Sequence, residues 1–293
     1  MGARHAPDDL QGEKHALMSV MILRLAALLY AAAAASYVLF FARPRQVRAA
    51  RAGLWLIAAA FVVHAVSIGF ACNEFGGAEF FNLRGGFGLL GWIAAGAFLL
   101  LQRFYPLPAA GAFVLPLVLI AVLPGFFGLG PDAPAAIPKS VRVPAIGVHV
   151  STALGGVALF AIAFVVALMY LLQEREVKGK RFGALFSRLP SLASLDQLNQ
   201  RLVRVGFAVY SVALVTGAVV AKNAWGSFWS WDPQQIASLV VWLLYGAMVQ
   251  LRHVGVHGRR YALLTLAGFA LVLTSMIAMG AVPQFTRHGG DFQ

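Results

Sequence analysis

Residues 147–173 read GVHVSTALGGVALFAIAFVVALMYLLQ and contain no charged side chain. A helix rises 1.5 Å per residue and crosses the hydrocarbon core of a bilayer in about 20 residues, so this stretch is long enough to span a membrane. The rest of the chain has a similar character: 60% of its 293 residues are hydrophobic, 12% are charged, and the mean hydropathy is +0.78. A soluble core cannot absorb that apolar share. The sequence therefore predicts an all-α polytopic membrane protein.

Eight apolar runs of this kind follow one another along the chain. We expect one membrane domain over 1–293, with a helical bundle at 18–284 and a polar segment at 174–202 that contains a short interfacial helix. The N-terminus lacks a short apolar core with a small-residue cleavage site, so we expect no cleaved signal peptide. The predicted spans are 18–42, 52–71, 86–102, 107–129, 145–172, 203–221, 235–251 and 262–284.

The formal net charge of +12 falls on one side of this predicted bundle. The segments on that side hold fifteen Lys and Arg residues against three acids, whereas the other side holds seven against eight. Arg24 lies within the first span, and we expect its side chain to extend outward. Basic loops stay in the cytoplasm. We therefore place 174–202 on the cytoplasmic side of a bacterial inner membrane, and both termini and the loop 222–234 on the outer side. The charge therefore calls for no nucleic-acid partner.

The stretch AWGSFWSWDP, residues 224–233, concentrates aromatic rings in the last of these outer loops. Trp225, Trp229 and Trp231 are three of the six tryptophans in the chain. Two interpretations stay open: an interfacial aromatic belt, which normally spreads over many helix ends, and a platform for a flat ligand. The residues that follow have a local role as well, because Asp232 is a suitable N-cap for the next helix.

Pro233 suits the first position of that helix, and Gln235 is placed to complete a capping box.

Two histidines flank the tryptophan-rich loop on the outer side. His149 lies near the outer start of the fifth span, and His288 lies just beyond the eighth. Neutral imidazole is a good ligand for iron, and haem is a flat plate that takes two axial ligands between apolar surfaces. Either histidine taken alone is more typical of an uninvolved surface residue. Their joint position above a tryptophan platform favours a haem site.

Other histidines and the single cysteine carry less information. His64 lies inside the second span, where a polar ring is either a functional group or one end of an interhelical hydrogen bond. His253 and His257 are spaced i, i+4, which suits a metal site on a helix, but their arginine neighbours favour a solvated cytoplasmic patch. Cys72 is the only cysteine, so the chain has no disulfide pair and no CxxC motif. No nucleophile or acid–base pair indicates conventional catalysis.

These motifs together resemble those of a known family. AKNAWGSFWSWDPQQIASLVVWLLY, residues 221–245, is similar to the WWD segment of the CcsA/ResC proteins, which handle haem in c-type cytochrome assembly. The resemblance covers roughly residues 55–293. It extends to the first outer histidine in GVHVSTALGG, the helix LDQLNQRLVRVGFAVYSVALVTGAVVA, the second outer histidine in RHGGDF, and the membrane histidine in FVVHAVSIGF.

The resemblance implies a haem-handling factor that presents haem b, held non-covalently, on the outer face for attachment to the CxxCH of an apocytochrome c. It implies that His149 and His288 are the axial ligands of the haem iron. It places Trp225, Trp229 and Trp231 beside the ring, and His64 at an inner site. A CcsB/ResB-like membrane partner with a large outer domain is implied too. The chain is then at most the haem-handling half of a cytochrome c synthase.

Some positions depart from the family pattern. The usual DPKET reads DPQQI at 232–236, and the acidic NLYES-like stretch reads NLRGG at 82–86. Where the family often has a second membrane histidine this chain aligns Gln250, with His253 one turn further along. These departures leave the outer site intact and affect the inner one. Two alternatives therefore stay open: a regulatory or scaffold protein of haem synthesis in the same superfamily, and a haem transporter.

Overall fold

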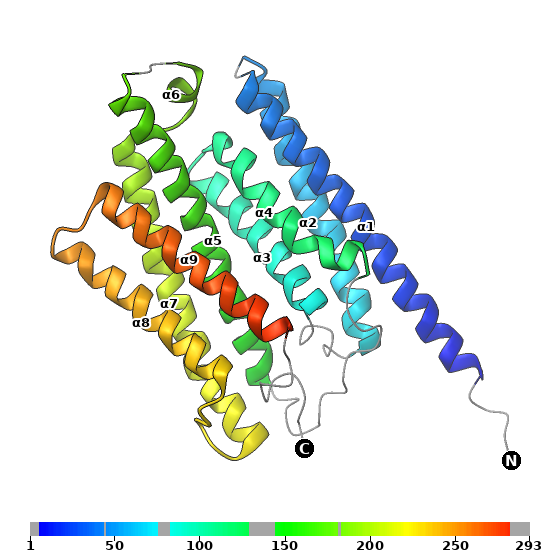
Figure 1. Cartoon of the computed structure of the whole chain (residues 1–293). Coiled ribbons are helices and arrows are strands. Elements are labelled where there is room, and N and C mark those ends of the chain that lie inside the picture. The colour runs from blue at the N-terminus through cyan, green and yellow to red at the C-terminus, as the bar shows by residue number, and fades with distance from the viewer. Residues whose placement is uncertain (1–5, 44, 76–82, 129–143, 181–182, 282–293) are drawn as a thin grey trace, which may run out of the picture. The chain divides into compact units, whose positions relative to one another are not determined.

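The computed structural model describes residues 6–43, 45–75, 83–128, 144–180 and 183–281, and all regular structure within them is helical (Figure 1). In chain order the helices are α1 (Ala6–Ala42), α2 (Val47–Phe75), α3 (Leu83–Phe104), α4 (Pro108–Phe126), α5 (Pro144–Lys178), α6 (Ala184–Arg188), α7 (Leu192–Trp225), α8 (Pro233–His253) and α9 (Gly258–Ala281).

Eight of these helices are long and apolar enough to cross a membrane, one for each predicted span. α1 shows why they need lipid rather than water around them. Leu17, Met21, Leu25 and Leu28 recur every three or four residues along one face of α1, and all four are exposed. Continuous apolar faces of this kind are stable where lipid covers them. The prediction of an all-α, multi-pass membrane protein is therefore confirmed.

Helix packing divides the chain into two units, which are described separately. Unit 1 comprises Met1–Leu100 and Leu115–Ala136, and unit 2 comprises Leu101–Val114 and Ile137–Gln293. The prediction of a single membrane domain over 1–293 stays a prediction.

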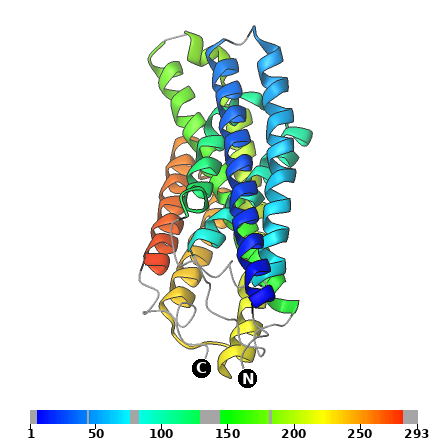
Figure 2. The same cartoon turned by 90° about the vertical axis from the view of Figure 1, so that its right-hand side faces the viewer.

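In unit 1, α1 and α2 lie side by side along most of their length (Figures 1 and 2). Ser67 Oγ on α2 donates to the carbonyl of Ser19 on α1 at 2.7 Å, within the buried interface. On the other side of α2, the Phe61 ring stacks on Trp92 of α3 with centroids 4.7 Å apart. Small residues allow this close approach, because a Cβ on Gly96 would lie 2.8 Å from the Phe61 ring.

Arg24, inside the α1 span, has a specific partner in unit 1. Its Nε donates to the carbonyl of Phe126, the last residue of α4, at 3.2 Å. The final carbonyls of a helix have no intrahelical partner, so Arg24 caps α4. Its side chain is exposed, and the helix cap accounts for its charge inside an apolar helix.

In unit 2, α5 and α7 form the most extensive helix pair, and α8 and α9 pack against them. Two glycines bring α5 and α7 together: a Cβ on Gly156 would lie 2.8 Å from Tyr210, and a Cβ on Gly206 would lie 2.8 Å from Phe160. The Phe160 ring also stacks on Tyr245 of α8. Small residues at the interface are typical of packed membrane helices.

Unit 2 also contains a buried hydrogen bond between helices. Asn199 of α7 donates to Thr265 of α9 at 3.1 Å, and both side chains are buried. Side-chain hydrogen bonds of this kind join membrane helices that lipid surrounds.

Segment 174–202, expected as a polar loop with one short helix, is largely helical. α5 continues to Lys178, and α7 begins at Leu192. The expected interfacial helix is divided in two, because Pro190 interrupts it and Ser191 starts a new helix as its N-cap.

The ends of α5, α7, α8 and α9 near this segment form the basic end of unit 2, where Asp196 and Glu174 pair with basic side chains. The Asp196 carboxylate accepts hydrogen bonds from two guanidinium nitrogens of Arg252, at 2.9 and 2.5 Å, and from the backbone N–H of Gly258 at 3.0 Å. Glu174 accepts from Arg259 at 3.1 Å and pairs with Lys178 at 2.8 Å. These contacts join four helix ends. Figure 1 shows α6 and the α8–α9 turn at this end of unit 2, with the α7–α8 connection at the opposite end.

Candidate functional site

The tryptophan loop, residues 226–232, connects α7 to α8 and has a defined backbone. It begins at Gly226, which ends α7 in the left-handed conformation with φ +76° and donates to Lys222. It ends at Asp232, the N-cap of α8, whose carboxylate accepts from Gln234 N at 2.9 Å. The predicted cap at Asp232 is thus confirmed, with Pro233 opening the helix. Both helix ends hold the loop in place.

Gln235 contacts the loop at a residue that precedes the N-cap, whereas in a capping box this side chain bonds to the N-cap residue itself. Its Oε1 accepts from Ser230 N at 2.9 Å and from Ser230 Oγ at 3.2 Å, two residues before the N-cap. On the other side of the loop, Lys222 Nζ donates to Gly226 O at 2.7 Å and lies 5.5 Å from the centroid of the Phe228 ring. The loop backbone is therefore held by side chains from both helices.

Two aromatic rings of the loop are exposed rather than packed in the interior of the protein. Trp231 is 74% exposed and Phe228 is 58% exposed. Trp231 also has a positive φ of 55°, a conformation that costs a bulky residue roughly 1–3 kcal/mol. Trp229 meets Trp231 edge to face with centroids 5.5 Å apart. The rings present a large apolar surface that the described residues leave uncovered.

Trp229 adds a polar group without a partner. Its Nε1 is buried and makes no hydrogen bond with the part of the chain that the structure describes. A buried donor left unpaired costs about 1–3 kcal/mol, and such a group needs an explanation. A ligand that accepts a hydrogen bond would supply one.

His149 lies on the first turns of α5 and packs on α7. Its Nδ1 lies 2.9 Å from the carbonyl oxygen of Ala213. A carbonyl only accepts, so Nδ1 carries the proton, and Nε2 is left with a lone pair. Metal-binding histidines typically hold the second ring nitrogen in this way. His149 is thus oriented and in the correct tautomer to bind iron through Nε2.

Gly217 makes this arrangement possible. A Cβ at Gly217 would lie 2.7 Å from His149 Cε1 and 2.9 Å from Nδ1, so any side chain there would displace the ring. Gly217 precedes Trp225 by eight residues on α7. The His149 ring therefore lies roughly 12 Å along the axis of α7 from the start of the tryptophan loop, on the side toward the basic end of unit 2.

His64 occupies a separate place in unit 1, on α2. It is 1% exposed, its ring meets Tyr30 edge to face at 5.9 Å, and its Nδ1 has no hydrogen-bond partner among the described residues. A cavity of about 30 Å³ beside it is lined by residues of α1, α2 and α3, among them Ser67 and Arg84. That volume holds about two waters. It does not hold a macrocycle, so iron binding by His64 requires these helices to separate.

The other predicted residues either lie outside the described residues or are not assembled into a site within them. His288 lies outside the described residues, so its meeting with His149 stays a prediction. His253 ends α8, His257 follows a turn, and both are exposed, which favours the solvated patch over a metal site. Within the described residues no group of three or more His, Cys, Asp or Glu forms a metal cage. Gln250, the aligned inner position, is exposed on α8.

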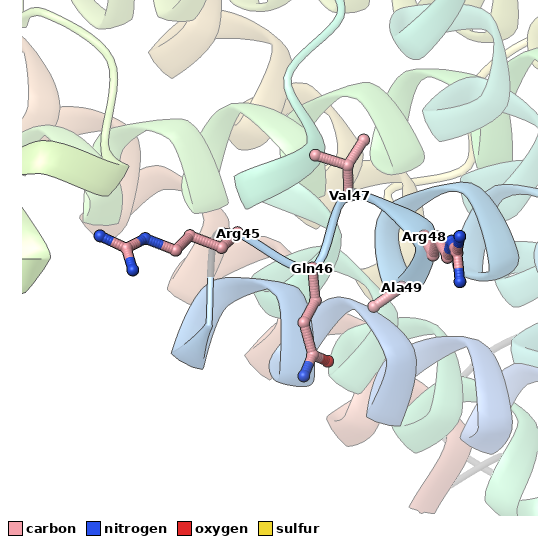
Figure 3. A pocket seen from close by; sticks show the side chains of 5 residues that line it. All are labelled: Arg45, Gln46, Val47, Arg48 and Ala49. Carbon is pink, nitrogen blue, oxygen red and sulfur yellow. The ribbon is translucent and has the colours of Figure 1, made fainter.

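A hollow at the α1–α2 turn is lined by Arg45, Gln46, Val47, Arg48 and Ala49. Figure 3 shows the side chains of Arg45 and Arg48 pointing away from each other. Their guanidinium groups therefore do not converge on one anion, and the hollow is not a candidate site.

Sequence reasoning missed three residues of these sites: Ala213, Gly217 and Arg84. Ala213 acts through its backbone, which leaves no signal in the sequence. Gly217 stands in an apolar helix where glycine is common. Arg84 carried a signal, since the sequence has it in NLRGG where the family has an acidic stretch.

Comparison with known proteins agrees with these features. A family model described as cytochrome C assembly protein matches residues 80–283. That region contains the tryptophan loop and His149, but not His64. The cytochrome c biogenesis protein CcsA of Parasynechococcus marenigrum (strain WH8102) is 30% identical over 222 residues, which cover 68% of this chain and 73% of that protein.

Another relative extends the similarity over more of the chain. The cytochrome c biogenesis protein CcsA of a strain of Prochlorococcus marinus is 27% identical over 253 residues, 76% of this chain and 79% of the relative. The chain therefore belongs to the cytochrome c assembly protein family, in its CcsA group, and has a role in cytochrome c biogenesis.

Proposed function

We propose that this protein binds haem b non-covalently at the outer face of a bacterial inner membrane and presents it for attachment to apocytochrome c. The observation that carries this is the hydrogen bond from His149 Nδ1 to Ala213 O, which leaves Nε2 available for iron. His288 is the second axial ligand in this proposal. Trp225, Trp229 and Trp231 cover the macrocycle.

The described residues fit such a group. The hydrogen bond of His149 Nδ1 to Ala213 O orients the lone pair of Nε2, and apolar rings are exposed in the loop. The buried indole N–H of Trp229 lacks an acceptor among the described residues. Bound haem supplies two vinyl groups, to which the cysteine thiols of the client add to form thioethers. The protein's own residues hold the iron, exclude water from the ring and orient a vinyl edge.

The chain's share of the reaction is binding and orientation. The proposal therefore includes a CcsB/ResB-like partner with a large outer domain, and apocytochrome c as client. The basic end of unit 2 faces the cytoplasm in this arrangement, and the tryptophan loop faces the periplasm. A reporter active only outside the cytoplasm should work when fused after Phe292 and fail when fused near Lys180. The opposite pattern would place the tryptophan loop inside and refute the outer site.

The main test is His149→Ala. We expect the purified variant to lose most of its haem, or to hold it only in oxidised form, and the yield of holocytochrome c to fall at least about tenfold at matched protein levels, as for loss of an iron ligand. Added imidazole should restore part of the reduced bis-imidazole spectrum, because it fills the vacated iron position.

His253→Ala is the matched control, since this histidine is exposed at the end of α8 and should leave assembly unchanged. If His149→Ala and His288→Ala each keep the wild-type spectrum and still mature cytochrome c, the outer site is wrong.

A further inference from the structure

Three glycines at the interface of α5 and α7, one of them the glycine that faces His149, each receive a large side chain of the other helix. A Cβ built on any of the three would lie 2.7 or 2.8 Å from that side chain, closer than real Cβ atoms approach. The three pairs are Gly217 with His149, Gly156 with Tyr210, and Gly206 with Phe160. The space beside each glycine is thus filled by its partner, and a larger residue there would push the two helices apart.

The three pairs lie in one antiparallel register. On α5, His149 is followed by Gly156 after seven residues and by Phe160 after four more. On α7, the partners occur in the opposite order and with the same spacings, first four residues and then seven. Spacings of four and seven residues keep side chains on one face of a helix, as in the heptads of packed helices. A single relative depth of α5 and α7 therefore satisfies all three contacts at once.

The order of large and small residues disfavours the neighbouring registers. If α7 were displaced by one heptad in one direction, His149 would face Tyr210, and two rings would compete for one layer. A displacement in the other direction would set Gly156 against Gly217 and leave a layer without side chains. The alternation of rings and glycines therefore specifies the observed register.

This register sets the depth at which α7 meets the His149 ring. Nδ1 of that ring lies 2.9 Å from the carbonyl oxygen of Ala213, one turn before Gly217 on α7. Successive carbonyls of a helix lie about 1.5 Å apart along its axis and are rotated by about 100°, so a small displacement of α7 removes the acceptor. The contacts at Gly156 and Gly206, roughly 10 and 16 Å along the helices from the His149 layer, oppose that displacement.

We propose that Tyr210 and Phe160 are positioning residues for the iron ligand. Their contacts with the facing glycines hold α5 and α7 in the register that orients the His149 ring and leaves its Nε2 for iron. This deepens the function proposed above and rests on it for the identity of the metal ligand. A role of the two rings in stability alone would leave the bonding of His149 unchanged when their contacts are altered in a protein that still folds.

The first experiment needs no haem and compares two adjacent glycines. Gly156→Ala places a methyl group 2.8 Å from Tyr210 Cβ and 3.2 Å from its Cα, so the backbone of α7 must move. Gly155→Ala is the matched control, because its Cβ would lie 3.5 Å from Val209, an ordinary contact. The full-length, haem-free protein with isotope-labelled histidine is studied by NMR, which distinguishes protonated from unprotonated ring nitrogens. The His149 signals are assigned by their loss in His149→Gln.

We expect His149 to be protonated at Nδ1 alone in wild type and in Gly155→Ala. Gly156→Ala should show a mixture of both tautomers, because Nδ1 loses the carbonyl that fixes its proton. Haem affinity of the same variant should fall about tenfold, as for other groups that orient a metal ligand. An unchanged tautomer in folded Gly156→Ala would overturn the positioning role.

A compensated pair of variants tests the register at the third contact, and it decides the matter if Gly156→Ala does not fold. Gly206→Ala places a Cβ 2.8 Å from the Phe160 ring, and Phe160→Leu shortens that side chain. We expect Gly206→Ala to weaken haem binding, and the double variant to recover affinity by about threefold or more, as for residues in contact. Phe160 also stacks on Tyr245, so Phe160→Leu alone is the reference. A double variant that binds haem no better than Gly206→Ala would contradict the inference.

The haem-free measurement separates this inference from the proposed function. Failure of wild type to bind haem would refute the proposed function, and the tautomer of His149 in Gly156→Ala would still decide whether the register orients the ring. Haem binding by wild type, together with an unchanged tautomer in Gly156→Ala, would refute the positioning role and leave the proposed function intact.

Discussion

The two ends of unit 2 differ in character, because one holds paired charges and the other holds exposed aromatic rings. At the basic end, Asp196 and Glu174 satisfy the charges of Arg252 and Arg259 and join four helix ends. At the other end, the tryptophan loop leaves rings exposed and the Trp229 N–H buried without a partner among the described residues. A satisfied network stabilises and orients, whereas unsatisfied groups held on a fixed backbone are available to a ligand. We therefore expect the basic end to contribute stability, and the tryptophan loop to contribute the binding that we propose.

Removing the ion pair between Asp196 and Arg252 at the basic end should have the largest effect on stability. Asp196→Ala leaves the Arg252 side chain, which is 10% exposed, without its carboxylate. Removing one partner of a fully buried pair costs about 3–5 kcal/mol, and the partial exposure of Asp196 lowers the expected loss to about 2–4 kcal/mol. Unfolding in detergent measures this, and haem per folded molecule should not change.

Arg259→Gln is the control for Asp196→Ala, because its side chain is 59% exposed and its ion pair contributes under about 1 kcal/mol. A loss of haem in folded Asp196→Ala would contradict the division of labour between the two ends.

The next largest effect is a loss of haem affinity that leaves the stability of the protein unchanged. Gly217→Ala places a methyl group 2.7 Å from His149 Cε1, so the ring must turn away from Ala213 O. We expect haem affinity to fall about tenfold, as for other residues that orient a metal ligand. Stability should hold or rise slightly, since Ala favours a helix over Gly by about 1 kcal/mol. Haem titration and the reduced spectrum measure the change.

Gly147→Ala, two residues before His149 and facing open space, should leave haem affinity at the wild-type value. Equal affinities for wild type and Gly217→Ala would show that the contact with Ala213 does not position the iron ligand.

The smallest expected effect comes from removing the single unpaired N–H group of Trp229. Trp229→Phe keeps an aromatic ring and removes the unpaired N–H. Haem retention should fall a few-fold, about the value of one hydrogen bond, while haem-free stability holds or rises. In Trp242→Phe the lost N–H is one that donates to Ser211 at 2.8 Å, so stability should fall and haem retention should not. The reverse pattern would mean that Trp229 is a packing residue only.

Much of the fold was predictable because its cause is local. Eight long apolar runs yield eight spans, since each helix satisfies its own backbone hydrogen bonds and needs only length and lipid. Asp232 and Pro233 predict the start of α8 for the same reason. The short interfacial helix expected within 174–202 is divided in two, and Pro190 and Ser191 held the signal for the break.

By itself, then, the sequence determined the spans, their charge asymmetry and the grouping of tryptophans next to a capped helix. Only the tertiary structure decided which nitrogen of His149 is available, because its partner is a backbone carbonyl 64 residues away that Gly217 exposes. The pairing of Asp196 with Arg252 and the meeting of Arg84 with His64 are equally non-local. Contacts between helices depend on rotation and depth, and composition along one helix specifies neither.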